Sequence, residues 1–327
     1  MSFYIGIDIA KDKFDLLWLR DPKSLKVKTK IFKNTQADFE HLKNWLEKNI
    51  TTELADIYVC MEATGIYHES LAYALYAMGV KVSVINPAFV KNFAKGLGVR
   101  SKTDKKDSFV LARYCVMTNP GPWKPEPEHI REIKALLARL EALEKDLQRE
   151  CNRLEKVQIS HASKTVITSI ELMIKCLEAE RDSIEKKIDE HIDQRPDLKQ
   201  DRIYLNSIPG IGSVLSREML SLLRSRDFSK ASQSAAFVGL APRLWESGKL
   251  KGRTTLCKNG PGRIRAKLYM AAIVAKQYNP DVKALYDRLV AAGKTKMQAL
   301  GAAMRKLVHI CFGVLKHQCK YQSQIVR

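Results

Sequence analysis

The first part of the chain alternates short apolar runs with helical patterns. Three runs typical of strands come first, at residues 3–9, 14–19 and 25–32, separated by charged or proline-containing turns. The elements expected after them are a helix that opens at Asn34 and Thr35, a strand at 56–62, a helix at 67–78, a strand at 80–86, a helix from 87 and a helix over 104–118. The order of these strands and helices, βββαβαβα, is that of the ribonuclease-H-type α/β fold.

The middle of the chain predicts two long helices that follow a linker. Residues 119–129 contain four prolines and one glycine, a composition typical of a linker. Apolar residues then recur at heptad spacing between 136 and 157, and again between 167 and 188, with a break at 160–163. We expect an antiparallel helical hairpin or an intermolecular coiled coil, because such a seam more often mediates assembly than chemistry.

Charge separates the last third of the chain from the rest. The 327 residues include 56 Lys and Arg against 36 Asp and Glu, a net charge of +20. Residues 1–130 carry +4, residues 131–200 carry −1 and residues 201–327 carry +17. A polyanion is the expected partner of the last third, and a solvated lysine face is the alternative. Pattern and charge together predict three domains, at 1–125, 126–197 and 198–327.

Secretory and membrane proteins are excluded by simpler features. The seven cysteines are scattered and form no CxxC pair, which suits a reducing cytoplasm. The longest uninterrupted apolar stretch, 71–80, is far shorter than the ~20 residues that a membrane span requires. The N-terminus reads directly as a strand, so we expect no leader and a cytoplasmic protein that acts without a membrane.

Four carboxylates fall where the expected strands and helices begin or end. Asp8 lies at the end of the first strand and Glu62 closes the fourth, while Asp104 and Asp107 project from one face at the start of a helix. Such carboxylates, brought together, hold two divalent cations, Mg²⁺ or Mn²⁺, which stabilise an in-line displacement at phosphorus. Taken singly, each has a simpler role as a helix-dipole acid, a turn acid or the partner of a lysine. Taken together, they favour a metal site.

Two features of the basic third point to nucleic acid. The turn IPGIG, with Gly210 and Gly212, resembles a helix-hairpin-helix turn, whose backbone N–H groups hold a DNA phosphate. A plain Pro-Gly turn between helices is the alternative. Ser247 lies in a polar loop among cations that would lower the cost of an attacking alkoxide, although spacing alone does not separate it from a solvated serine. These cations are Arg243, Lys249, Lys251 and Arg253.

A repeat near the C-terminus combines histidine and cysteine. His309 and Cys311 are followed eight residues later by His317 and Cys319. The spacing suggests zinc, but on a helix the members of each pair point about 200° apart. We therefore expect ordinary, partly buried helical side chains.

Seven sequence blocks, in order along nearly the whole chain, resemble the DEDD transposases of insertion sequences. This is the IS110 family, bridge-RNA-guided serine recombinases related to the Piv-type invertases. The blocks are YIGIDIAKDKFD (4–15), CMEATGIY (60–67), VINPAFVKNFAK (84–95), KTDKKDSFVLARYC (102–115), SIPGIG (207–212), AAFVGLAPRLWESG (235–248) and LYMAAIVA (268–275).

The resemblance implies a domain plan and a set of catalytic residues. The plan is an RuvC-like domain of the RNase H fold, a helical coiled-coil spacer and a mainly helical transposase domain with the helix-hairpin-helix-like turn. Asp8, Glu62, Asp104 and Asp107 match the family's acidic tetrad, which implies bound Mg²⁺. Ser247 matches the nucleophilic serine, which implies a 5′-phosphoserine intermediate. One subunit's tetrad would work on the serine of another.

The resemblance also implies partners. A structured non-coding guide RNA would pair with donor and target DNA, and the protein would read RNA shape and backbone. We expect a homo-oligomer, a dimer that becomes a tetramer on nucleic acid, in a bacterial or archaeal cytoplasm at the nucleoid. Besides the cations around Ser247, the residues expected to bind nucleic acid are Lys258, Arg263 and Arg265.

Three other functions compete with recombination. A metal-dependent nuclease or junction resolvase of RuvC type would use the same carboxylates with water as nucleophile, but has no need of the serine loop. An actin-like sugar kinase shares the IGIDIAKDK pattern, yet the further glycine-rich phosphate loops of that fold are missing from the sequence. A nucleic-acid binder with a decayed site is disfavoured because the four carboxylates and the serine all remain.

Overall fold

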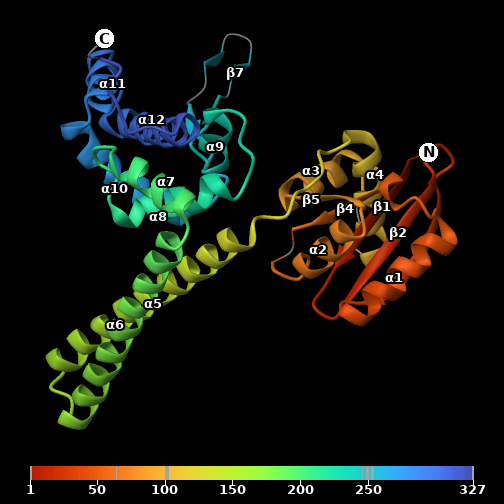
Figure 1. Cartoon of the computed structure of the whole chain (residues 1–327), viewed down its shortest axis with the longest axis horizontal. Coiled ribbons are helices and arrows are strands. Elements are labelled where there is room, and N and C mark those ends of the chain that lie inside the picture. The colour runs from red at the N-terminus through yellow and green to blue at the C-terminus, as the bar shows by residue number, and fades with distance from the viewer. Residues whose placement is uncertain are drawn as a thin grey trace. The chain divides into compact units, whose positions relative to one another are not determined.

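The computed structural model describes residues 2–63, 65–99, 103–244 and 254–325, together with the backbone of 246–247 and 250–251. Two compact units make up the chain, Met1–Pro125 and Glu126–Arg327 (Figure 1). In the described residues, no helix is long and apolar enough to cross a membrane.

A five-stranded mixed sheet forms the centre of the N-terminal unit. Its order is β3-β2-β1-β4-β5, in which β1 pairs antiparallel with β2 and parallel with β4. β2 pairs antiparallel with β3, and β4 pairs parallel with β5. The strands are β1 (Phe3–Ile9), β2 (Lys13–Asp21), β3 (Lys26–Lys33), β4 (Ile57–Glu62) and β5 (Lys81–Ile85).

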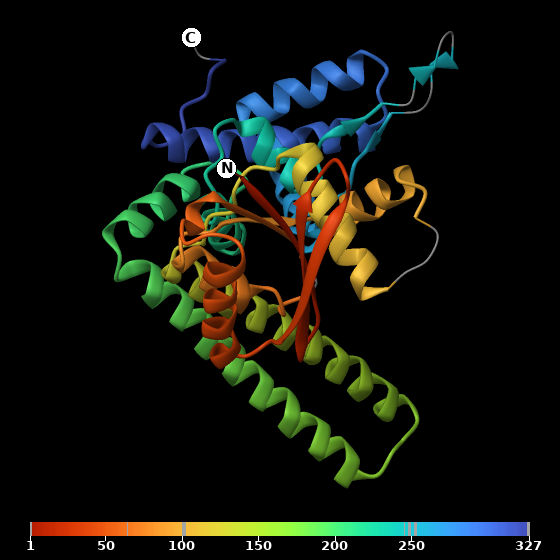
Figure 2. The ribbon, with the colours of Figure 1, turned by 90° about the vertical axis from the view of Figure 1, so that its right-hand side faces the viewer.

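Helices cover both faces of this sheet (Figures 1 and 2). They are α1 (Gln36–Asn49), α2 (Glu69–Ala77), α3 (Pro87–Gly96) and α4 (Asp104–Thr118), with a short 3₁₀ turn at Leu54–Asp56. Alternate residues of β1, Ile5 and Ile7 among them, pack into one core with the apolar sides of α1 and α2. The intervening residues therefore face α4. The strands and helices expected from the hydrophobic pattern are all present in the expected order.

Gly6 lets α4 lie directly on the backbone of β1. A Cβ atom at this position would come within 2.0 Å of the Ser108 carbonyl oxygen and 2.4 Å of the Ala112 nitrogen. Both are backbone atoms, so no side-chain rotation relieves the overlap. Ser108 also ties α4 to β2, because its hydroxyl donates a 2.8 Å hydrogen bond to the Asp15 carbonyl. The close approach fixes where the first turn of α4 lies relative to the end of β1.

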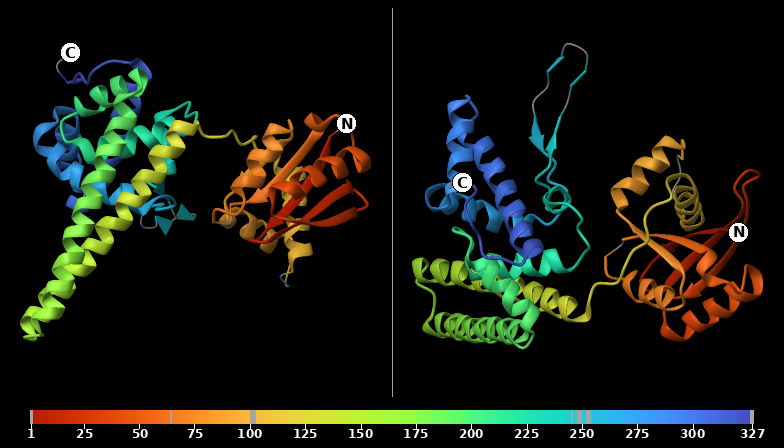
Figure 3. Two further views of the ribbon diagram at one scale, coloured as in Figure 1. Left: turned by 60° about the horizontal axis from the view of Figure 1, so that its bottom comes forward. Right: turned by 45° about the horizontal axis from the view of Figure 1, so that its top comes forward.

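The C-terminal unit is mostly helical. A long hairpin of α5 (Glu128–Ile159) and α6 (Lys164–Asp193) runs side by side (Figure 3). The predicted break near 160–163 is confirmed. The helices that follow are α7 (Pro196–Asn206), α8 (Ser213–Arg224), α9 (Ala231–Phe237), α10 (Gly262–Tyr278), α11 (Pro280–Ala291) and α12 (Lys296–His317). The base of the hairpin shares one hydrophobic core with these helices.

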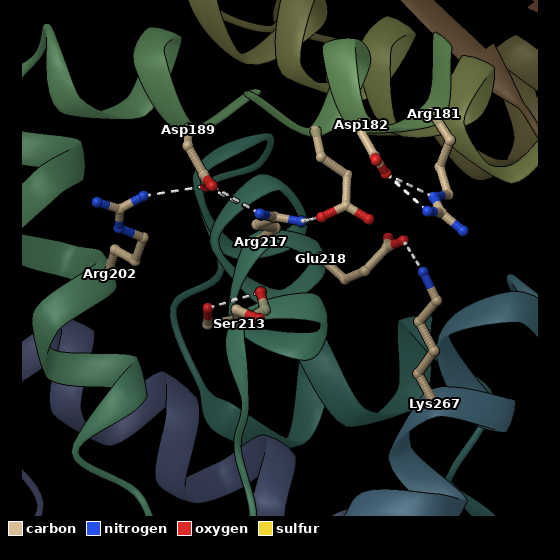
Figure 4. A network of polar contacts seen from close by, with 10 residues as sticks. Arg181, Asp182, Asp189, Arg202, Ser213, Arg217, Glu218 and Lys267 are labelled. Carbon is tan, nitrogen blue, oxygen red and sulfur yellow. Dashed lines mark hydrogen bonds and ion pairs between the residues drawn. The ribbon is translucent and has the colours of Figure 1, made fainter. Parts of the chain in front are cut away.

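Buried ion pairs join the hairpin to the later helices (Figure 4). Arg217 on α8 is 5% exposed and donates to Asp189 on α6 at 2.6 and 3.0 Å. Glu218, next to it and 1% exposed, accepts from Lys267 and Arg263 on α10, each at 2.9 Å. Removing one member of such a pair leaves a buried charge uncompensated, so these contacts fix the helices in one arrangement.

A β-ribbon interrupts the helices between α9 and α10. β6 (Pro242–Arg243) pairs with β9 (Thr255–Leu256), and farther out β7 (Glu246–Ser247) pairs with β8 (Leu250–Lys251). The sequence predicted only a polar loop here, because strands of two residues are too short to show an alternating pattern.

We predict that Gly6→Ala destabilises the N-terminal unit by several kcal/mol, because overlap with backbone atoms of α4 forces the sheet and the helix apart. Gly96→Ala is the matched control. It lies in α3 with open space around the added Cβ, and the substitution there should stabilise by about 0.5–1 kcal/mol. Urea unfolding of the two variants measures the difference. Equal midpoints would show that α4 does not press on β1.

Candidate functional site

Asp8 and Glu62 lie at the ends of adjacent parallel strands. The register pairs Ile7 of β1 with Met61 of β4, so the next residues of the two strands, Asp8 and Glu62, follow side by side. By the alternation of β1, Asp8 points to the face that α4 covers. Two carboxylates therefore meet at the carboxyl edge of the sheet, below the start of a helix.

That helix supplies two more carboxylates. Asp104 and Asp107 both lie in the first turn of α4, where the positive end of the helix dipole favours them. Thr103 caps the helix, because its hydroxyl accepts a hydrogen bond from the Lys106 N–H. Ser108 bonds the Asp104 carbonyl at 2.9 Å and ties this turn to β2.

Electrostatics show that the carboxylates lie close together. The pKa of Asp8 is raised from 3.8 to about 6. Burial is the largest cause, and repulsion from Asp107, Asp104, Asp15 and Glu62 adds to it in that order. The structure thus brings the other three residues of the predicted tetrad within electrostatic reach of Asp8.

Sequence reasoning missed Asp15 and Lys13. Asp15 stands directly opposite Asp8 in the β1–β2 pairing, which places both side chains on one face of the sheet. The Lys13 ammonium lies 2.9 Å from an Asp15 oxygen and 2.7 Å from an Asp104 oxygen. The hydrogen bonds to Asp104 and Asp15 raise the pKa of Lys13, and desolvation opposes this rise. The detectable signal was that Asp8 and Asp15 are each two residues from the turn at residues 10–13.

The chemistry of these side chains fits a divalent cation. The donors are carboxylate oxygens, the ligands that Mg²⁺ and Mn²⁺ prefer, and their negative charge is not balanced, as the pKa of Asp8 shows. One cation, the Lys13 ammonium, already lies between two of them. Within the described residues, no group of three or more Asp, Glu, His or Cys side chains is placed so that it could hold a metal ion.

Ser247 lies in the other unit, on the outer part of the β-ribbon. Its backbone on β7 pairs with Leu250 on β8 (Figure 1). Arg243 lies on β6 at the base of the ribbon and is exposed. Lys251 lies on β8. Lys249 and Arg253 lie outside the described residues.

The remaining predicted cations differ in their surroundings. Arg263 makes ion pairs with Glu141 on α5 and Glu218 on α8, each at 2.9 Å. Arg265 donates to the carbonyl oxygens of Val238 and Gly260 at 2.9 Å. Both arginines hold the unit together, whereas Lys258 is exposed beside the ribbon.

The IPGIG turn joins α7 to α8. Gly210 has φ +97°, and a Cβ there would lie 2.8 Å from the Ala275 Cβ of α10, so this glycine serves packing as well as the turn. Gly212 precedes α8 and is open to solvent. No side chain caps α8 among the described residues, so its first N–H groups point outward.

The His and Cys repeat does not form one cluster. Cys311 is fully buried in the core, whereas Cys319 is exposed and lies beyond the end of α12. His309 is partly buried and His317 is exposed. The expectation of helical, partly buried side chains is confirmed for His309. Cys311 is helical but fully buried and His317 is helical but exposed, whereas Cys319 is exposed and lies beyond the helix.

Comparison with known proteins assigns the family. A profile described as "Transposase" matches residues 5–158, and one described as "Transposase IS116/IS110/IS902 family" matches residues 203–287. The pilin gene-inverting proteins of Moraxella bovis and Moraxella lacunata are each 31% identical over 326 residues, 98% of this chain and 98% of their own. The transposase for insertion sequence element IS1111A of Coxiella burnetii is 22% identical over 97% of this chain and 91% of its own. The chain therefore belongs to the IS110 family of DNA transposases and recombinases.

Proposed function

We propose that this transposase cuts and rejoins DNA with Ser247 as nucleophile and with a divalent-metal site at Asp8, Glu62, Asp104 and Asp107. The crowding of carboxylates around Asp8 is the observation that carries the proposal. The order βββαβαβα and the mixed sheet support an RNase H/RuvC-like fold for the N-terminal unit. In proteins of that fold, carboxylates at the ends of the central strands serve phosphoryl transfer.

Each residue of the carboxylate cluster has a role that follows from its place. Bound Mg²⁺ or Mn²⁺ would supply charge stabilisation of the attacking and leaving oxygens. Asp8 and Glu62, fixed by strands, and Asp104 and Asp107, fixed by the first turn of α4, would hold it from two sides. Lys13 keeps Asp104 oriented by its 2.7 Å contact.

Ser247 would make the reaction reversible. Its Oγ attacks the phosphorus of a DNA phosphodiester, the serine proton is lost, and the bond to the 3′-oxygen breaks as that oxygen takes up a proton. The phosphate is then esterified to the serine. Attack by a 3′-hydroxyl on this ester rejoins the DNA and releases the serine without ATP. The tetrad of one subunit serves the serine of another in this proposal.

The C-terminal unit would hold nucleic acid, both donor and target DNA and a structured guide RNA. The charge of +17 over residues 201–327 supports contact with several phosphates. Gly212 and the uncapped start of α8 support the helix-hairpin-helix assignment of the IPGIG turn. Arg243 and Lys258, both exposed beside the ribbon, support contact near Ser247.

The hairpin would assemble subunits. Its heptad residues are buried near the base, at Leu140 and Ile188 for instance, but no residue of 144–183 is buried. The seam residues in that distal half are Leu147, Leu154, Val157, Ile167, Ile170, Ile174 and Leu177, all partly exposed. A second copy of the hairpin would cover them and form a dimer, from which a tetramer builds on nucleic acid.

For the tetrad, we predict that Asp8→Asn abolishes strand cleavage in Mg²⁺ and leaves DNA binding nearly unchanged. The same variant should be more stable than the wild type at pH 7.5 in EDTA, by about 1 kcal/mol after allowance for partial exposure. The sign follows from the raised pKa: the neutral carboxyl favours folding below pH 3.8, and this contribution is lost as the pH rises through about 6.

Asp12→Asn is the matched control, because Asp12 is an exposed acid in the same β1–β2 turn. Cleavage assays and thermal melts at pH 5 and pH 7.5 compare the variants. An Asp8→Asn enzyme that cuts DNA like the wild type would remove the tetrad from the mechanism.

For the serine, we predict that Ser247→Ala abolishes both cleavage and rejoining, since the nucleophile itself is lost. Ser229→Ala, at an exposed serine of the same unit, should keep both activities. On a nicked suicide substrate, the wild type should form a denaturation-resistant adduct that maps to Ser247. Cleavage by Ser247→Ala at the wild-type rate, with no adduct in the wild type, would replace this mechanism with attack by water, as in a resolvase.

For assembly, we predict that Leu154→Ser combined with Ile170→Ser converts the dimer to a monomer, because the two serines place polar groups on the apolar seam. Leu172→Ser is the control, because Leu172 is 62% exposed and lies off the heptad seam. Light scattering at one protein concentration gives the masses. A wild-type protein that is monomeric both alone and on nucleic acid would contradict the role given to the hairpin.

A further inference from the structure

A groove lies between α12 and the chain that follows it, and its lining includes none of the residues assigned above to DNA cutting. Its volume is about 540 Å³, within the range of sites that hold small organic ligands. One wall is a face of α12 that includes Ile310 and Val314, and the other is the segment 319–324. The groove therefore combines an apolar wall with the polar chain that closes it.

A buried carboxylate holds the second wall in place. Asp281, at the start of α11, accepts from the Tyr321 hydroxyl at 2.6 Å and from the Gln324 N–H at 3.1 Å. The Tyr321 hydroxyl also lies 2.9 Å from the side-chain oxygen of Asn279. The backbone N–H of Tyr321 donates to the Ser207 hydroxyl at 2.8 Å. Burial and the nearby Asp281 raise the pKa of Tyr321 to about 12, so it stays a donor. The wall is thus built in advance of any ligand.

Two lysines line the groove, and neither side chain takes part in the hydrogen bonds described above. Lys306 comes from α12 and Lys320 from the second wall, and both line the groove with His317. The carboxylate of Asp281 is already shared among Tyr321 and Gln324. Two ammonium groups at the lining of one small groove favour an anionic ligand, and a phosphate group is the anion that this family handles.

The His309 ring also lines the groove. Its Nε2 atom is buried and makes no hydrogen bond within the described part of the chain. Burial, and then the charges of Arg305 and Lys306, lower the pKa of His309. A ligand in the groove would therefore lie beside this ring.

We infer that this groove binds one nucleotide unit of a nucleic-acid strand. Its phosphate contacts Lys306 and Lys320, its base lies against Ile310 and Val314, and the His309 ring lies beside it. Inorganic phosphate alone would leave the apolar wall uncovered and most of the 540 Å³ unfilled. The inference rests on the proposed nucleic-acid substrate and adds a separate pocket for an unpaired nucleotide.

The inference also accounts for the histidine repeat. His309 and His317 are eight residues apart, a little over two helical turns, and both line the groove. Cys311 points instead into the core. The two histidines of the repeat thus line the groove, and Cys311 is a core residue.

The first test is binding of a short single strand at one salt concentration, followed by fluorescence anisotropy. Lys306→Gln with Lys320→Gln should weaken binding about tenfold, because two charge-assisted contacts are lost. Lys294→Gln with Lys296→Gln is the matched control. It removes the same charge from exposed sites outside the groove and should weaken binding no more than about twofold. Equal losses in the two double variants would overturn the inference.

The second test uses the unaltered protein, so it does not depend on the folding of a variant. NMR of the seven histidine rings follows titration with a mononucleotide, with a single strand and with inorganic phosphate. The His309 ring should shift with the mononucleotide and with the strand. A shift with phosphate only, or a His309 ring that no ligand moves, would overturn the inference. Failure of the wild type to bind any strand would instead contradict the proposed function.

Discussion

Repulsion among carboxylates at one edge of the sheet is the constraint on which the N-terminal unit depends. Burial, and then repulsion from four neighbouring acids, raise the pKa of Asp8 to about 6. A protein selected for stability alone would separate these charges. The fold instead forces them together, because α4 lies on the backbone of β1 at Gly6 and Ser108 fastens its first turn to β2. The Lys13 ammonium offsets part of the repulsion.

The proposed mechanism draws its residues from both units. The carboxylates lie on a sheet whose strands and helices fix their positions, whereas Ser247 lies on the outer part of a short β-ribbon. In the C-terminal unit, buried ion pairs of Arg217 and Glu218 hold the helical hairpin and the later helices in one arrangement. A rigid helical body with a ribbon that carries Ser247 suits the proposed mechanism, in which this serine reaches a phosphate at the carboxylates of another subunit.

Much of this arrangement could be predicted from the sequence, for identifiable reasons. The strands have clear alternating or apolar patterns, and Asp8 and Glu62 stand at their ends, so the sheet places them together. Asp15 was missed because its role depends on strand register, which pairs it with Asp8. The surroundings of Arg263 were also hidden: a count of charges cannot show that Glu141 and Glu218, far away in sequence, would bind it.

The most direct test of the central claim is the pKa of the Asp8 carboxyl group, measured by NMR with and without Mg²⁺. The crowded carboxylates predict a pKa of about 6 in EDTA and a value below 4 once Mg²⁺ is added, while NaCl of equal ionic strength should have much less effect. A pKa near 4 in EDTA would mean that the carboxylates do not converge. A pKa of about 6 that Mg²⁺ leaves unchanged would mean that they do not hold a metal.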